Sequence, residues 1–145
     1  MTFIKFDTQS PYYQDMLALR HLVLRKPLGL NLYQQDLANE VNYWHFGVLQ
    51  NGRLVACVMI VPQNNTQVTL KQMAVSPDAQ GNGLGQKLIR HVERDLISNG
   101  ISLIELAARD TAIGFYQQLG YRCIGEPFVD VTLTHQLMTK ILTSD

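Results

Sequence analysis

Three glycines lie close together in the segment Gln80-Gly81-Asn82-Gly83-Leu84-Gly85, directly before a long amphipathic stretch. Inside a helix, glycine costs about 1 kcal/mol relative to alanine, so its use at Gly83 and Gly85 needs a reason. A first helical turn without side chains lets a large anion approach the free backbone N–H groups, and the helix dipole favours negative charge there. We therefore predict an anion-binding helix start, in preference to a loop that only turns the chain.

The spacing of these glycines excludes two well-known phosphate-binding motifs. A dinucleotide fingerprint counted from Gly81 or Gly83 needs its third glycine where the chain has Gln86 or Leu88. A P-loop needs glycine before its lysine and serine or threonine after it, whereas Lys87 lies between Gln86 and Leu88. The anion therefore has to be identified from the wider pattern.

The residues around this segment predict alternating strands and helices in a single domain over residues 1–145. Ser10-Pro11 is a typical helix start, because a serine cap precedes a proline at the first helical position. Asn51-Gly52 between two apolar runs predicts a tight hairpin turn, since both central residues need positive φ. Strands are expected at 3–6, 43–49, 54–61, 66–75, 101–107, 121–128 and 133–142, and helices from 11 to before 27, at 33–41, at 83–100 and at 110–119.

The helix after the glycines should bury one face against the sheet. Helical spacing gives that face to Leu84, Leu88, Ile89, Val92 and Leu96. The charged residues Lys87, Arg90, Glu93 and Arg94 are expected to lie away from it. Because this helix connects two predicted strands, the segment from 66 to 107 implies a parallel strand pair inside a mixed sheet.

With these elements in place, the glycine segment resembles the Q/R-x-x-G-x-G/A signature of the GNAT superfamily of N-acetyltransferases. The run from Leu70 to Pro77 is similar to the fourth strand of that family, and the run from Leu106 to Tyr121 contains its F/Y-Y-x-x-x-G-F/Y ending. The match covers most of the chain, and the stretch from Leu19 to Gly29 resembles that of an uncharacterised GNAT subgroup. The match implies an α/β fold of the GNAT type, with a mixed, mostly antiparallel sheet, a central parallel β-α-β pair and helices on both faces.

The resemblance implies an enzyme that transfers an acetyl group from acetyl-coenzyme A to a primary amine, by direct attack in a ternary complex. In the family, the backbone of one strand pairs with the pantetheine arm and the glycine loop holds the pyrophosphate. Here the pantetheine contacts fall on Met73, Ala74 and Val75, and the pyrophosphate contacts fall on Gln80, Gly81, Asn82, Gly83, Leu84 and Gly85. Arg109 stands where the family often has asparagine, and is expected either to contact coenzyme A or to pair with Asp110. Gln80 replaces a common arginine, so Lys87 or Arg90 would have to supply the missing charge.

The catalytic residues also follow from the resemblance. Tyr116 falls at the position of the general acid that protonates the departing thiolate, and the backbone N–H of Val75 would hold the oxyanion. A phenol suits this role because it donates well and stays protonated at neutral pH. The base that deprotonates the amine is left open between His135, Glu105 and an ordered water chain.

The early stretch from Leu19 to Gly29 corresponds to the acceptor wall of the family. Arg20, Arg25 and Lys26 in this stretch either meet an anionic acceptor or form a solvated face. For Lys26 we expect the solvated face.

Composition limits the remaining possibilities. The 145 residues carry equal numbers of acidic and basic side chains, which argues against a nucleic-acid partner. No run approaches a membrane span, and Cys57 and Cys123 lack metal-ligand spacing and read as small buried residues. We therefore expect a cytoplasmic enzyme without a metal, acting on a small-molecule or peptide amine, and leave a homodimer open. The alternatives are another acyl donor or acceptor, or a catalytically silent coenzyme A-binding module, against which Tyr116 argues.

Overall fold

Seven strands form one mixed sheet in the order β1-β2-β3-β4-β5-β7-β6. The computed structural model describes residues 1–130 and 132–143. The strands are β1 (Thr2–Phe6), β2 (Trp44–Gln50), β3 (Arg53–Pro62), β4 (Gln67–Val75), β5 (Leu103–Arg109), β6 (Arg122–Asp130) and β7 (Leu133–Ile141). Neighbouring strands run antiparallel except β4 and β5, which are parallel. The predicted mixed sheet with one central parallel pair is therefore confirmed.

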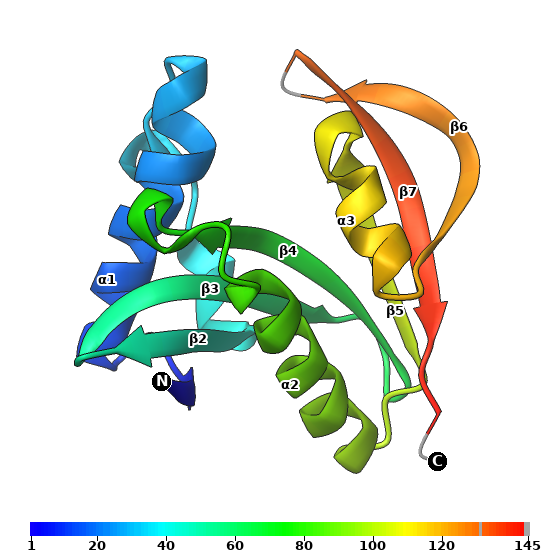
Figure 1. Ribbon diagram of the computed structural model, residues 1–145, viewed down its shortest axis with the longest axis horizontal. Coiled ribbons are helices and arrows are strands. Elements are labelled where there is room, and N and C mark those ends of the chain that lie inside the picture. Colours follow the sequence, from blue (N-terminus) through cyan, green and yellow to red (C-terminus); the bar gives the residue numbers. More distant parts are fainter. Residues whose placement is uncertain (131, 144–145) are drawn as a thin grey trace.

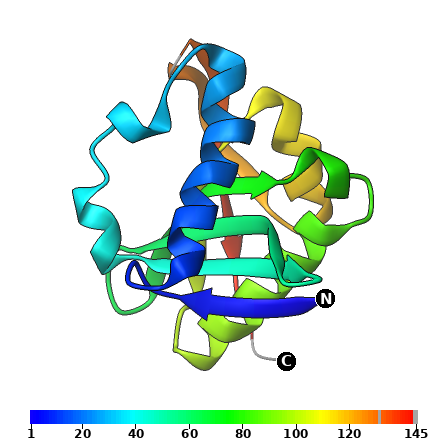
Figure 2. The ribbon, with the colours of Figure 1, turned by 90° about the vertical axis from the view of Figure 1, so that its left-hand side faces the viewer.

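Helices cover both faces of this sheet. The α-helices are α1 (Pro11–Arg20), α2 (Leu84–Ser98) and α3 (Ile113–Gln118). A π-helical turn, η1 (His21–Arg25), continues α1, and 3-10 turns lie at Lys26–Leu28, Leu32–Gln34, Ala38–Asn42, Pro77–Ala79 and Asp110–Ala112. Helix α1 crosses one face of the strands, as Figure 2 shows, while α2 and α3 lie on the opposite side (Figure 1). Among the described residues, no helix has the length and apolar character needed to cross a bilayer.

Two hydrophobic clusters, one on each face, hold the layers together. On one face, the apolar side of α2 packs on the strands, with Leu88, Ile89 and Val92 fully buried. On the other, Met16 and Leu17 of α1 pack against Cys57. The buried face of α2 agrees with the sequence prediction, since Leu84 to Leu96 at helical spacing all lie in the core.

The parallel pair is short, and this shapes the molecule. Register pairs between β4 and β5 run only from Gln67–Leu103 to Thr69–Glu105. Beyond Thr69 the two strands diverge, so that β5, β7, β6 and α3 form one arm and β1 to β4 with α1 form the other (Figure 1). A bulge at Gln72, whose φ is 59°, bends β4 away from β5.

The cap of α1 and the turn between β2 and β3 form as the sequence predicts. The Ser10 hydroxyl accepts a hydrogen bond from the Tyr12 amide at 3.2 Å and so caps α1. Asn51 and Gly52 have φ of 52° and 78° and connect β2 to β3. These conformations are the ones that the Asn-Gly pair favours.

The helix predicted at 33–41 was wrong, because tertiary contacts overrule its apolar spacing. The chain there forms only short 3-10 turns, and Glu40 is buried at 6% exposure. Both Glu40 carboxylate oxygens accept from Arg20, at 2.7 and 2.8 Å, and one also accepts from the Tyr13 hydroxyl at 2.8 Å. Burial raises the pKa of Glu40, but the hydrogen bonds and charge of Arg20 outweigh it, so the net pKa is lowered. Arg20 therefore ties this segment to α1 instead of facing solvent.

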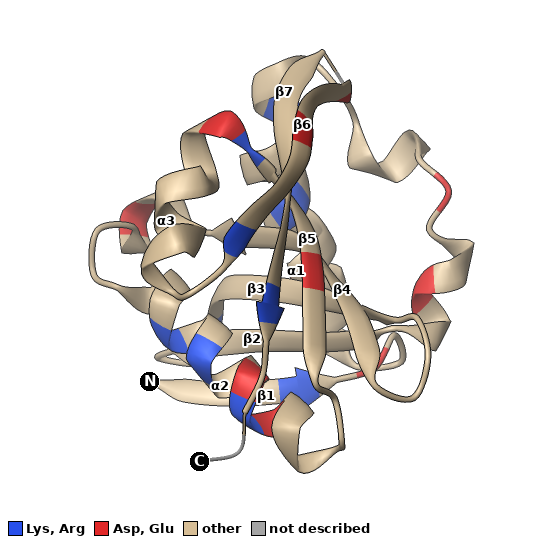
Figure 3. Ribbon diagram, turned by 90° about the vertical axis from the view of Figure 1, so that its right-hand side faces the viewer, with Lys and Arg blue, Asp and Glu red and all other residues tan. Residues whose placement is uncertain are grey.

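Two further expectations were corrected. Glu93, expected on the solvent side of α2, is 7% exposed and accepts hydrogen bonds from the Tyr121 hydroxyl at 2.9 Å and from Lys140 at 2.9 and 3.1 Å. Cys57 is buried as expected, but Cys123 is exposed on the edge strand β6. Seen from the side of β6 and β7, acidic and basic residues are interspersed (Figure 3).

Candidate active site

A cleft of about 1170 Å³ opens where β4 and β5 separate. Its walls come from the second half of β4, from β5, from the start of α2, from α3, from η1 and from the β6–β7 end. The cleft thus connects the α2 and α3 face of the sheet with the α1 face. Residues far apart in the sequence meet around it because the sheet is incomplete at this point.

One wall of the cleft is the bare beginning of α2. Gly83 caps the helix with φ of 74°, and Gly81 before it has φ of 85°, a region that side chains rarely adopt. The first helical bond runs from the Lys87 amide to the Gly83 carbonyl at 3.1 Å, so the amides of the preceding turn have no intrahelical partner. A Cβ built at Gly81 or Gly83 would meet nothing within 4 Å. This is open space in which an anion can reach backbone N–H groups.

Gly85 has a different reason to be glycine. A Cβ there would lie 3.2 Å from the Met73 side chain and 3.2 Å from the Phe115 ring. All three residues line the cleft. The missing side chain therefore lets α2 approach β4 and α3 closely, which keeps the amides of its first turn at the edge of the cleft.

The second half of β4 forms the floor. The Ser76 amide donates to the Val55 carbonyl at 2.8 Å, so alternate residues Val75 and Met73 direct their backbone groups away from β3. These backbone groups face the cleft, where β5 no longer pairs with β4. The Gln80 side chain donates to the Val75 carbonyl at 3.0 Å, whereas no described side chain accepts from the Val75 N–H on the cleft side.

Tyr116 approaches the cleft from α3. Its side chain is buried, contacts Phe115 and Tyr121 edge to face, and lines the cleft. No described residue hydrogen-bonds its hydroxyl, whereas the hydroxyl of Tyr121 is bonded to Glu93. Burial raises the pKa of Tyr116, so the phenol stays protonated at neutral pH.

The two candidate bases lie on neighbouring strands, Glu105 on β5 and His135 on β7. Glu105 pairs with Thr69 at the point where the strands begin to separate, and His135 pairs with Arg109 at the far end. Four residues of strand, about 13 Å, separate these positions. Both side chains line the cleft. His135 Nδ1 lies 2.9 Å from the Leu133 carbonyl and its ring stacks on Phe128.

The α1 side of the cleft is formed by the π-helical turn η1. Val23, Leu24 and Arg25 line the cleft there. Arg109 reaches across from β5 and donates from Nη2 to the Leu24 carbonyl at 3.1 Å. This contact joins the two arms on the face opposite α2. Of the two roles expected for Arg109, the pairing with Asp110 is not formed among the described residues, and the contact with coenzyme A stays a prediction.

The geometry can be compared with known proteins. The sequence model of the Acetyltransferase (GNAT) family matches residues 8–121. The chain belongs to the GNAT acetyltransferase family. Its sheet, with one parallel pair, is accordingly the GNAT fold, and the protein is an acyltransferase.

Individual GNAT relatives agree over most of the chain. The uncharacterised N-acetyltransferase YitI of Bacillus subtilis (strain 168) is 29% identical over 123 residues, which cover 79% of this chain and 81% of YitI. An acyl-CoA N-acyltransferase from Pseudomonas aeruginosa superposes with a TM-score of 0.83 at 18% identity, over 96% of this chain and 98% of that chain. A GNAT family acetyltransferase from Elizabethkingia anophelis, solved with acetyl-CoA bound, gives a TM-score of 0.72 at 19% identity and covers 97% of each chain.

Almost all of the expected catalytic and cofactor-binding residues surround one cleft. Met73, Ala74, Val75, Gln80, Gly81, Gly83, Leu84, Gly85, Arg109, Tyr116, Glu105 and His135 line it, and Asn82 does not. Lys87 and Arg90, expected to supply the missing arginine charge, are exposed and lie outside the lining, so that role stays a prediction. Gln86, one position before Lys87, does line the cleft. Nothing in the sequence around Gln72 indicates its left-handed bulge, which widens the fork, the gap where β4 and β5 separate.

Proposed function

We propose that this protein transfers an acetyl group from acetyl-coenzyme A to a primary amine within a single domain over residues 1–145. The observation that supports it best is the continuity of the cleft, which runs from the free amides of α2, through the fork, to η1 on the opposite face. A donor and an acceptor can therefore enter from opposite faces and meet between β4 and β5. Catalysis by approximation in such a ternary complex needs no covalent enzyme intermediate.

The donor fits the bare side of the cleft. The pyrophosphate would accept hydrogen bonds from the unpaired amides after Gly83, where the helix dipole also favours negative charge. The pantetheine arm would lie along Met73 and Val75, in the place that β5 vacates. The free N–H of Val75 would then donate to the thioester oxygen as negative charge develops on it.

Two proton transfers complete the reaction. The amine nitrogen forms a bond to the acetyl carbon while the carbon–sulfur bond breaks. Tyr116 would give its hydroxyl proton to the departing sulfur, because it is the protonated, unpartnered group that lines the cleft on α3. The leaving thiolate is thereby released as a thiol.

His135 is our choice for the base that removes the proton of the amine. Since the Leu133 carbonyl can only accept, the hydrogen bond at 2.9 Å puts the proton of a neutral ring on Nδ1. Nε2 then carries a lone pair, and no described residue hydrogen-bonds it. Glu105 competes for the role through an intervening water, from the closed end of the fork.

Acetyl-coenzyme A binding and acetyl transfer can be tested separately. Calorimetry should show binding of acetyl-coenzyme A to the wild-type chain and weak binding to Gly83→Leu. Because Gly83 is exposed at a positive φ, circular dichroism must show that this variant is folded. A screen of amines, peptides and polyamines, read out by free thiol, should find at least one acceptor. Binding without any amine-dependent thiol release would favour a silent coenzyme A-binding module instead.

A further inference from the structure

Two arginines from distant parts of the chain converge on one carbonyl at the α1 side of the cleft. Arg25 donates from Nη1 and Arg109 from Nη2 to the Leu24 oxygen, at 3.2 and 3.1 Å. Arg25 also donates from Nε to the Gln35 side chain at 3.1 Å. Both guanidinium groups are half-buried and line the cleft, and most of their N–H donors have no partner among the described residues.

Neither arginine of the pair forms an ion pair among the described residues, in contrast to Arg20 and Arg53. Arg20 is paired with Glu40 at 2.7 Å, and Arg53 with Asp78 at 2.7 Å. Within residues 1–130 and 132–143, neither Arg25 nor Arg109 forms an ion pair with a carboxylate. Asp130 lines the same cleft and its charge acts on Arg25, but among the described residues it forms no ion pair with either arginine.

Burial and like charge both oppose this arrangement. Burial lowers the pKa of Arg25, and the charges of Arg20 and Arg109 lower it further, while Asp130 offsets only part of the effect. Two cations held in a shared cleft without a partner favour an incoming anion, because it would relieve the repulsion and complete the hydrogen bonding.

We propose that the acceptor amine carries an anionic group, a carboxylate or a phosphate, which Arg25 and Arg109 bind together. This inference rests on the proposed function and names the class of its acceptor. The planar guanidinium offers paired N–H donors that match the oxygens of either group. Arg109 is the register partner of His135, so an amine close to the bound anion lies within reach of the base.

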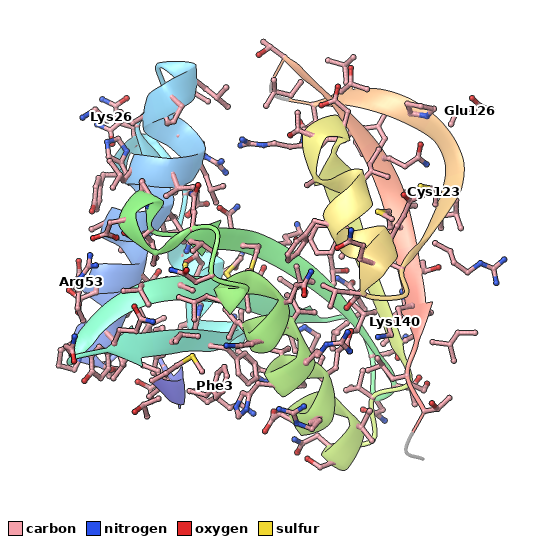
Figure 4. The ribbon with its side chains drawn as sticks, viewed as in Figure 1. Phe3, Lys26, Arg53, Cys123, Glu126 and Lys140 are labelled. Carbon is pink, nitrogen blue, oxygen red and sulfur yellow. The ribbon has the colours of Figure 1, made fainter. Side chains whose placement is uncertain are left out.

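The position of the pair assigns it to the acceptor and not to the donor. The phosphates of the donor belong at the start of α2, on the face of the sheet opposite α1. The two arginines instead meet at Leu24 in η1, which continues α1. Lys26, the next residue, is exposed, and its side chain points away from the fork (Figure 4). It supplies a matched control of the same charge.

Matched amines test the inference on the full chain. The probes are histidine against histamine, for a carboxylate, and phosphoethanolamine against ethanolamine, for a phosphate. Wild-type kcat/KM should be at least about tenfold higher for the anionic member of one pair, and the better pair identifies the anion. Arg25→Gln and Arg109→Gln should each lower the ratio of kcat/KM for that member to kcat/KM for its neutral counterpart by about tenfold or more. Lys26→Gln should behave as wild type.

Several results would overturn the inference while leaving the proposed function intact. These are turnover with no preference for anionic amines, an equal loss on both members of a pair in the arginine variants, and turnover of neutral amines alone. If Arg109→Gln weakened acetyl-coenzyme A binding in calorimetry without changing the preference, Arg109 would belong to the donor site and the pair would be wrong. Loss of acetyl-coenzyme A binding by the wild-type chain would instead refute the proposed function itself.

Discussion

Tyr116 and Tyr121 are adjacent buried phenols with opposite hydrogen-bonding states, which allows a paired test of the general acid. Their ring centroids are 5.6 Å apart. The Tyr116 hydroxyl has no partner among the described residues, whereas the Tyr121 hydroxyl donates to Glu93 at 2.9 Å. Replacing each by phenylalanine removes one oxygen and keeps the ring. We expect one variant to lose activity and the other to lose stability.

The size of each effect follows from these contacts. Tyr116→Phe removes no protein hydrogen bond, so the free energy of unfolding should change by less than about 0.5 kcal/mol, while kcat falls about a hundredfold or more. Tyr121→Phe deletes a buried bond to a carboxylate, worth about 1.5 to 3 kcal/mol. Because Lys140 still holds Glu93, the lower end applies, and the melting temperature should fall by roughly 5 °C.

Thermal unfolding, calorimetry with acetyl-coenzyme A and single-turnover thiol release measure the three quantities separately. Donor affinity should be nearly unchanged in both variants, and kcat of Tyr121→Phe should stay within about threefold of wild type. Unchanged single-turnover rates in Tyr116→Phe would make Tyr116 a core aromatic only. Equal losses of rate in both variants would show that packing of the ring pair, and not proton donation, controls the reaction.

Three other predictions follow from the site and the core. Gly85→Val should lower acetyl-coenzyme A affinity by about tenfold or more because its side chain would collide with the residues around it, whereas Gly114→Val, which meets open space, should not; calorimetry decides. His135→Ala should remove the ascending limb of the pH profile of kcat/KM, and a limb that survives would leave Glu105 or water as the base. Since the pKa of Glu40 is lowered on folding, the ionised carboxylate stabilises the folded state above about pH 4.5, and this stabilisation is lost as the pH falls through the lower folded pKa. The melting temperature of wild type should therefore fall towards that of Glu40→Gln in acid. Parallel curves of melting temperature against pH for the two proteins would contradict this.

The donor side of the site could be predicted from the sequence because its determinants are local. Glycine at positions 81, 83 and 85 reports directly on backbone conformation and on missing side chains, and the apolar spacing of α2 reports on the face that packs. The parallel pair follows from the strand–helix–strand order. These signals need no knowledge of distant contacts.

The acceptor side could not be predicted in this way because distant contacts build it. Arg109 and Leu24 are 85 positions apart, and nothing near either residue indicates the other. The segment at 33–41 has the apolar spacing of a helix, but the buried pair of Arg20 and Glu40 decides its path. In the same way, the charge of Glu93 predicts a solvent-facing side chain, but its hydrogen bonds with Tyr121 and Lys140 allow it to be buried.

The short pairing between β4 and β5 also affects how readily the protein is degraded. Three register pairs join β4 to β5, so separating these two strands breaks few backbone hydrogen bonds. A donor lying along the vacated edge of β4 would bind the closed form, and at about a hundredfold excess over its Kd it would add about 2.7 kcal/mol to the free energy of unfolding. Protease sensitivity would then follow the supply of acetyl-coenzyme A, and the abundance of the enzyme would rise and fall with the metabolite that it consumes.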